Sequence, residues 1–183
     1  FRVGFCYAVG LFAPLFQFTQ VSMGNPLGWV ALTIFESLYL AVFAWLWAAV
    51  SGTAWVREHL LSGAAIFAFL FAGCEQLRSS WPLGGFAWAR LAQSQIYSPL
   101  LPLASWLGSS GLTFVVALLG ALGALGLVSL LRLRLEKAVT ALALAALLVL
   151  GPTFIELPTA AQAGTLRVGA VQGSIPGKDP SQA

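Results

Sequence analysis

The residues of this sequence that could do chemistry gather in one stretch, residues 73–95. Only 8% of the 183 residues are charged and 59% are hydrophobic, so a cluster of charged, amide and aromatic side chains is informative. Such side chains are costly to keep beside apolar segments, and they tend to mark the working face of a membrane protein. The candidate substrate-binding residues are Glu75, Arg78, Trp81, Phe86, Trp88, Arg90 and Gln95.

Two interpretations of the charged members of this stretch stay open. Glu75 and Arg78 are three positions apart, so on a helix they can neutralise each other. Alternatively, Arg78 or Arg90 holds the phosphate of a lipid headgroup, because a guanidinium group matches phosphate geometry. The sequence therefore allows either a structural ion pair within one helix or a direct contact with a lipid substrate.

Four further polar or sulfur side chains have simpler explanations. Glu36 lies near the middle of an apolar segment, where an acid is a functional candidate by default. We expect instead a protonated carboxyl group bonded to a Ser or Tyr of a neighbouring helix. Cys6 and Cys74 lie in or at the end of apolar runs without companions at ligand spacing, which is typical of packing residues. His59 is expected in a solvated loop, so no metal site and no cofactor is predicted.

The composition predicts an integral membrane protein. A mean hydropathy of +0.89 exceeds what one soluble core can hide, because a soluble protein usually has roughly a quarter of its residues charged. The formal net charge is +3, but the basic residues are few and scattered. Nucleic-acid sites need a clustered basic face, so nucleic acid is excluded as a partner and the lipid bilayer is expected.

The apolar runs predict about five transmembrane helices within a domain of residues 1–158. The run 27–50 alone gives roughly 36 Å of helix, enough for a hydrocarbon core of about 30 Å. Residues 78–103 are broken by Pro and Gly but aromatic, so they should form an interfacial loop with its tryptophans at headgroup depth. The fourth run is rich in Gly and Ala, either for close helix contact or by composition alone. The five runs are residues 3–18, 27–50, 60–77, 111–131 and 138–155.

The basic residues predict the orientation of these helices. Arg2, Arg57, Arg132, Arg134 and Lys137 fall on one side of alternating helices, and Arg78, Arg90 and Arg167 fall on the other. Basic residues favour the cytoplasmic side, so the loop 78–103 and the residues after 159 are expected on the outer face. Residues 159–165 are predicted to be a linker, and residues 166–171 to be a buried strand that opens a soluble domain.

Two separated stretches resemble the bacterial apolipoprotein N-acyltransferases. Residues 75–78 (EQLR), 85–88 (GFAW) and 94–95 (SQ) are similar to the periplasmic loop of that family, and residues 168–176 (VGAVQGSIP) are similar to the first strand of its nitrilase-like domain. Ala87 stands where the family's motif has proline. The resemblance implies an all-α polytopic membrane bundle followed by the first strand of a truncated α/β nitrilase-like domain, residues 166–183.

The resemblance also implies an activity. Members of the family move an acyl chain from a membrane phospholipid to the amino-terminal cysteine of a diacylglyceryl-lipoprotein, through a thioester on a catalytic cysteine. Their catalytic Glu, Lys and Cys belong to the nitrilase-like domain, so no catalytic residue is expected in this chain. Because the chain begins at Phe1 and ends in a polar tail, we expect an internal piece of a longer inner-membrane protein that is inactive alone.

Two other classes of function are weighed against this one. In some actinobacteria a similar domain is fused to a polyprenol-phosphate mannosyltransferase, for which it serves as a membrane anchor. A small transporter is the third class, but a transporter would need paired polar groups in several helices, and only Glu36 lies deep in a predicted span. The downstream sequence would distinguish the anchor from the acyltransferase.

Overall fold

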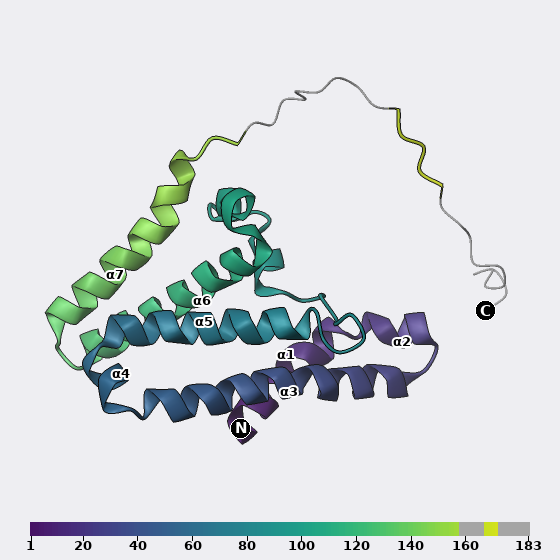
Figure 1. Ribbon diagram of the computed structural model, residues 1–183, viewed down its shortest axis with the longest axis horizontal. Helices are drawn as coiled ribbons and strands as arrows, with labels where there is room; N and C mark the ends of the chain where they lie inside the picture. The colour runs from purple at the N-terminus through teal and green to yellow at the C-terminus, as the bar shows by residue number, and fades with distance from the viewer. Residues whose placement is uncertain (158–166, 172–183) are drawn as a thin grey trace.

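The structure, a computed structural model, describes residues 1–157 and 167–171, and its regular elements there are helices (Figure 1). Residues 167–171 are neither helix nor strand, so the strand expected at 166–171 stays a prediction. The expected linker, 159–165, and residues 172–183 lie outside the described residues. The elements are α1 (Arg2–Leu15), α2 (Phe18–Met23), α3 (Pro26–Ser51), α4 (Ala54–Glu58), α5 (Leu60–Arg78), η1 (Leu91–Gln95), η2 (Leu101–Leu103), α6 (Ala104–Leu131), α7 (Leu135–Leu150) and η3 (Gly151–Phe154).

Four of the five predicted spans are long and apolar enough to cross a membrane. They are Pro26–Ser51, Leu60–Arg78, Leu101–Leu131 and Leu135–Phe154. The first run instead forms the 14-residue α1, followed after a break at 16–17 by α2. The expectation of a multi-pass helical membrane protein is therefore confirmed, with a short first helix.

The start of α3 follows from two adjacent residues. The Asn25 side chain accepts a hydrogen bond from the Leu27 N–H at 2.8 Å, and Pro26 occupies the first turn. An Asn cap satisfies an amide that has no partner inside the helix, and Pro fits the first turn because its missing N–H is not needed there. The Asn25-Pro26 pair thus sets where α3 begins.

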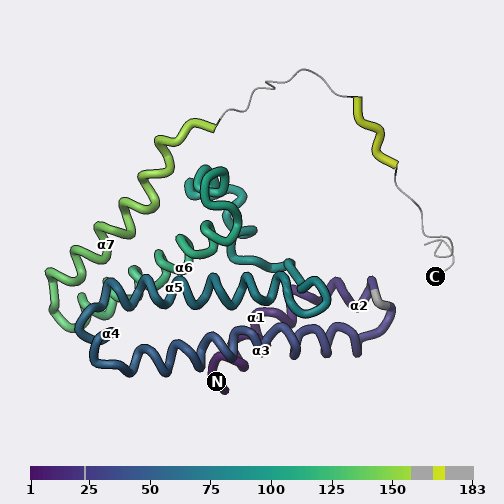
Figure 2. Tube along the Cα trace, in the orientation of Figure 1, coloured from purple at the N-terminus to yellow at the C-terminus, as the bar shows by residue number. Residues whose placement is uncertain are grey.

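The helices pack largely in chain order. α1 lies on α3, α3 on α5, α5 on α6, and α6 on α7 (Figure 1). Consecutive long helices run in opposite directions, so the chain returns repeatedly to the same two ends of the bundle. The turns 52–59 and 132–134 lie at one end, which we call the α4 end. The segment 79–103 begins at the other, the loop end, where its first part curls beside α1 and α2, and its second part, with η1 and η2, packs on α6 (Figure 2).

Small and aromatic residues set the contacts between these helices. A Cβ placed on Gly4 of α1 would lie 2.4 Å from the Ala44 Cβ of α3, so only glycine allows this approach. Between α3 and α5 the Phe43 ring meets the Phe67 and Phe71 rings edge-on at centroid distances of 5.1 and 5.2 Å. This apolar framework holds the C-terminal end of α5, where the candidate residues begin.

The Gly-rich run of α6 uses its small residues selectively. A Cβ on Gly126 would lie 2.8 Å from the Leu142 side chain, so this glycine brings α6 and α7 together. A Cβ on Gly120 or Gly123 would meet nothing within 4 Å. Of the two explanations that the sequence left open for this run, close helix contact therefore applies at Gly126 and does not apply at Gly120 or Gly123.

Candidate functional site

A buried ion pair joins α3 to the end of α5. The Arg78 Nη1 donates to the Glu36 Oε2 at 3.0 Å, and the two side chains are 1% and 2% exposed. The same nitrogen donates to the Phe86 carbonyl at 3.1 Å, and Nη2 donates to the Ala89 carbonyl at 3.4 Å. The guanidinium also lies 5.3 Å from the centre of the Phe12 ring. Arg78 therefore ties α1, α3 and the loop together.

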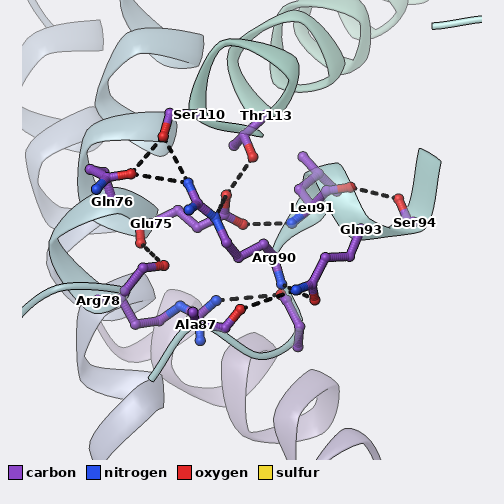
Figure 3. A network of polar contacts seen from close by, with 12 residues as sticks. Glu75, Gln76, Arg78, Ala87, Arg90, Leu91, Gln93, Ser94, Ser110 and Thr113 are labelled. Carbon is purple, nitrogen blue, oxygen red and sulfur yellow. Dashed lines mark hydrogen bonds and ion pairs between the residues drawn. The ribbon is translucent and has the colours of Figure 1, made fainter. Parts of the chain in front are cut away.

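A second polar centre lies one turn earlier on α5, at Glu75 (Figure 3). Its Oε1 accepts from the Leu91 N–H at 2.7 Å, and its Oε2 accepts from the Thr113 hydroxyl of α6. The Arg90 Nε lies 3.6 Å from Oε2. One carboxylate thus receives a loop amide, a hydroxyl of α6 and a loop guanidinium, which is how a buried charge is made tolerable.

Two neighbouring polar groups complete the attachment of Arg90. Its Nη2 donates to the Gln76 Oε1 at 3.1 Å and to the Ser110 Oγ at 2.9 Å (Figure 3). The Ser110 hydroxyl in turn donates to Gln76 Oε1 at 2.5 Å. Residues from α5, the loop and the first turns of α6 therefore share one network.

These contacts rule out one of the two open interpretations of the charged residues and correct one expectation. Glu75 and Arg78 do not pair with each other, because Arg78 points to Glu36 and Glu75 points to Arg90. Glu36 does bind a neighbouring helix as expected, but its partner is an arginine and not a Ser or Tyr hydroxyl. The Tyr39 hydroxyl instead donates to the Trp81 carbonyl at 2.5 Å.

The loop passes close to the end of α5, and glycine makes this passage possible. Gly85 has φ +72°, and a Cβ there would lie 2.2 Å from the Ser79 carbonyl carbon and 2.3 Å from the Ser80 nitrogen. The Phe86 N–H donates to the Arg78 carbonyl at 3.0 Å. The loop therefore folds back onto the helix end that carries its two main anchors.

The aromatic candidates separate into inward and outward groups. Phe86 is half-buried and meets the Phe16 ring edge-on at 5.1 Å. Trp81 and Trp88 are 62% and 60% exposed, and the Trp88 ring lies 5.4 Å from Phe18 of α2. The two tryptophans thus form the outer surface of the loop, in keeping with the interfacial role expected for them.

Gln95 lies apart from the polar network. It ends η1 and its Nε2 donates to the Ser94 hydroxyl at 2.7 Å. The structure thus brings Glu75 and Arg78 of α5 together with Phe86 and Arg90 of the loop. Gln95 does not join them.

A cavity of about 390 Å³ lies between α1, α3, α5 and the loop. Its walls are almost wholly apolar and include Leu11, Leu15 and Phe71, and Glu75, Arg78 and Arg90 also line it but present little polar surface to it. An apolar space with a few convergent polar groups is the usual form of a site for an amphipathic ligand. This cavity can accept part of an acyl chain next to charged groups.

Several members of this network were missing from the sequence-based list. Thr113, Ser110 and Gln76 are ordinary residues of helices, and nothing in their local spacing marks them. Glu36 did carry a signal, since it is the deepest acid of the sequence, and pairing it with a distant arginine would have been the informative step. Within residues 1–157 and 167–171 no three His, Cys, Asp or Glu side chains are grouped to hold a metal ion.

The fold and the site together define a multi-pass helical membrane protein with a loop anchored over a mainly apolar cavity. The sequence profile of the apolipoprotein N-acyltransferase N-terminal domain matches residues 1–122. The chain therefore belongs to the apolipoprotein N-acyltransferase family.

Curated relatives agree with this assignment. The chain is 33% identical over 189 aligned residues to the apolipoprotein N-acyltransferase of Azotobacter vinelandii, covering 94% of this chain and 34% of the relative. It is 34% identical over 181 residues to the enzyme of that name from Shewanella oneidensis, covering 93% of this chain and 32% of the relative. The chain thus spans about a third of the length of these relatives. No solved structure gives a significant match to it.

Proposed function

We propose that the complete protein carrying this chain transfers an acyl chain from a membrane phospholipid to the amino-terminal cysteine of a diacylglyceryl-lipoprotein. The reaction proceeds through a thioester on a cysteine of a nitrilase-like domain that begins near residue 166, outside the helical part described above. The helical part receives the lipid substrates. The observation that carries this proposal is the mainly apolar cavity under the anchored loop, with Glu75, Arg78 and Arg90 beside it.

The chemistry of the substrates supports this division of labour. Both substrates keep their acyl chains in the bilayer while their reacting atoms lie at headgroup height. A site for them therefore needs apolar walls below and polar groups above. The cavity under the loop supplies the apolar walls and has Glu75, Arg78 and Arg90 among its lining residues, and Trp81 and Trp88 on the outer surface of the loop suit headgroup depth.

The two arginines have different parts in this proposal. Arg78 is buried and engaged by Glu36 and two carbonyl groups, so it positions the loop and does not bind a headgroup. Arg90 lines the cavity, and its Nη1 has no hydrogen-bond partner among the described residues. Arg90 is therefore the residue that can reach a lipid phosphate.

Filling the cavity tests the proposal. In the complete protein, changing both Leu11 and Leu15 to Trp makes the cavity smaller without changing a residue of the polar network. Transfer of a labelled acyl chain from phospholipid vesicles to a diacylglyceryl lipopeptide should fall at least tenfold. The matched control changes Val3 and Leu27 to Trp, two exposed positions that do not line the cavity.

The control variant should keep near-normal turnover. If both double variants reach the membrane in normal amounts and transfer acyl chains equally well, the cavity is not the lipid site. The coding sequence downstream of Ala183 supplies an independent check. A nitrilase-like domain with its Glu, Lys and Cys supports the acyltransferase, whereas a glycosyltransferase domain directly after the helices supports the membrane anchor of a mannosyltransferase.

A further inference from the structure

The cavity under the loop continues into a second hollow of about 600 Å³. The two spaces share Phe71 of α5 and Leu91 of η1. On α5 their linings form one series with steps of three or four residues, which places these side chains on one face of the helix. From the loop end to the α4 end, the series is Arg78, Cys74, Phe71, Phe67, Ala64 and Leu60. The two spaces therefore form one groove along α5, which we call the long groove.

Helices α1 and α3 show the same continuity. On α1, Leu15 and Leu11 line the cavity under the loop, and Tyr7 lines the second hollow. On α3, Phe43 lines the first space and Trp47 lines the second. Neighbours in each series are four residues apart, so each helix presents one face to the whole groove. The apolar and aromatic walls of the cavity under the loop thus continue toward the α4 end.

The long groove is longer than one leaflet of a bilayer, whereas its first part is shorter. The 7 steps from Arg78 to Phe71 correspond to roughly 10 Å of helix, and the 18 steps from Arg78 to Leu60 to roughly 27 Å. One leaflet contributes about half of a hydrocarbon core of about 30 Å. An acyl chain as long as one leaflet therefore exceeds the cavity under the loop. It ends about one helical turn beyond Phe71, close to the level of Phe67.

Gly120 of α6 lies at the level where such a chain ends. Helices α5 and α6 run in opposite directions, and the contact between Glu75 and Thr113 sets their register. Gly120 is seven positions after Thr113, so it lies at about the level of residue 68 of α5, and it lines the second hollow together with Phe67. A Cβ on Gly120 would meet nothing within 4 Å. The groove is therefore open at this point, and a larger side chain there can fill it.

We propose that the long groove holds the acyl chain that the complete protein transfers, and that Gly120 sets the chain length that the groove accepts. The proposal rests on the function proposed above, because it takes the cavity under the loop as the entrance for the lipid. The headgroup of the donor then lies at the loop end, and its chain runs along α5 past Phe71 and Leu91 and ends beside Gly120. A shorter chain ends before Gly120, so only longer chains depend on the open wall there.

Competition between two donors in the complete protein tests the role of Gly120. Dipalmitoyl- and dilauroyl-phosphatidylethanolamine, with different labels in their acyl chains, are supplied together in equal amounts, and a diacylglyceryl lipopeptide is the acceptor. Gly120→Phe should lower the ratio of palmitoyl to lauroyl transfer about tenfold, because the ring occupies the space of the last methylene groups of the longer chain. Transfer from the lauroyl donor should stay within about twofold of the wild-type value.

Gly123→Phe is the matched control. Gly123 lies on the same helix in equally open surroundings, but it lines neither space. This variant should transfer the two chains in the wild-type ratio, and an equal change of the ratio in both variants overturns the role of Gly120. If the wild-type protein transfers acyl chains and Gly120→Phe keeps the wild-type ratio, the chain does not reach Gly120, although the proposed acyl transfer stands. If the wild-type protein transfers no acyl chain, the proposed function fails and this proposal fails with it.

A measurement on the unchanged protein guards against variants that fail to fold. Phosphatidylethanolamine with a photoreactive group at the end of a palmitoyl chain is bound to the complete wild-type protein and activated, and the labelled residues are identified. Labels should fall on Phe67 or Ala121, which line the second hollow. Labels confined to Leu11 and Leu15 would mean that the chain stays in the cavity under the loop, and labels confined to exposed positions such as Phe69 would place it outside the groove. Either result overturns the proposal.

Discussion

At the scale of single residues, the molecule is organised by two carboxylates that form ion pairs with arginines from other segments of the chain. Glu36 and Arg78 are 42 positions apart, and both side chains are almost fully buried. Removing one partner of a buried pair leaves a charge without compensation, which costs far more than the pair itself contributes. Arg78 therefore matters because it holds α1, α3 and the loop in one arrangement.

Breaking this pair should destabilise the protein strongly. Arg78→Met leaves Glu36 buried and unpaired, so the free energy of unfolding should fall by about 3–5 kcal/mol. Thermal unfolding of the chain in detergent, followed by circular dichroism, measures the loss. The double variant Glu36→Leu with Arg78→Met should recover much of it, since an apolar pair leaves no charge buried.

A matched control for this prediction is Glu58→Gln, which removes an exposed acid outside both ion pairs. Its unfolding should change by less than about 0.5 kcal/mol, as is usual for surface substitutions. A double variant as unstable as Arg78→Met would mean that the pair itself is not what the single variant disrupts.

The turn of the loop is a second prediction at the residue scale. Gly84 and Gly85 both have positive φ, at +91° and +72°, but only a Cβ on Gly85 would collide with the backbone of Ser79 and Ser80. Gly84→Ala should cost about 1–2 kcal/mol from backbone strain alone. Gly85→Ala should cost clearly more, because the loop must also move away from α5. Equal losses of thermal stability in the two variants would contradict the close approach.

At the scale of elements, the sequence predicted the long helices well because their apolar runs exceed the thickness of a membrane. Their ends were predicted less well. The short helix α4, between the second and third predicted runs, was not predicted, and α6 begins at Ala104, before a kink at Gly108, and not at 111. Short helices and kinks depend on contacts with neighbouring elements, which local composition does not record.

The candidate site was predicted only in part for a related reason. The cluster of residues 73–95 indicated where the polar contacts of the loop form, since Glu75, Arg78 and Arg90 all take part in them, and a role in substrate binding stays a prediction. Their partners could not be predicted from spacing. Glu36 and Thr113 come from other helices, and helix packing brings them to α5. Spacing within one helix favoured a Glu75–Arg78 pair that does not form.

Contact between α6 and α7 supplies a prediction at the element scale. Gly126→Leu inserts a side chain where a Cβ already lies 2.8 Å from Leu142, so α7 must shift away. The melting temperature in detergent should drop, with an overpacking cost of about 1–3 kcal/mol. Gly123→Leu, on the same helix but with open surroundings, should cost less. If the order of the two variants is reversed, Gly126 is not the point of close helix contact.

At the scale of the whole molecule, the bundle has two chemically different ends. Charges are paired beneath the loop at one end, and basic residues are in excess at the other. Basic residues favour the cytoplasmic side of a membrane, so this asymmetry predicts that the loop faces outward. The lipid role of the loop depends on this orientation, because the proposed acyl transfer takes place on the outer face.

The most direct test of this orientation uses two exposed leucines, one at each end of the bundle. Leu83, in the loop, has φ +55° and is fully exposed, and Leu133, between α6 and α7, has φ +54° and is 84% exposed. Each is changed to Cys in a chain in which Cys6 and Cys74 are replaced by Ala, and intact cells are treated with a membrane-impermeant thiol reagent. The orientation proposed above predicts that Leu83→Cys is labelled in intact cells and Leu133→Cys only after the cells are broken. Labelling of Leu133→Cys but not of Leu83→Cys in intact cells would contradict both the orientation and the lipid role of the loop.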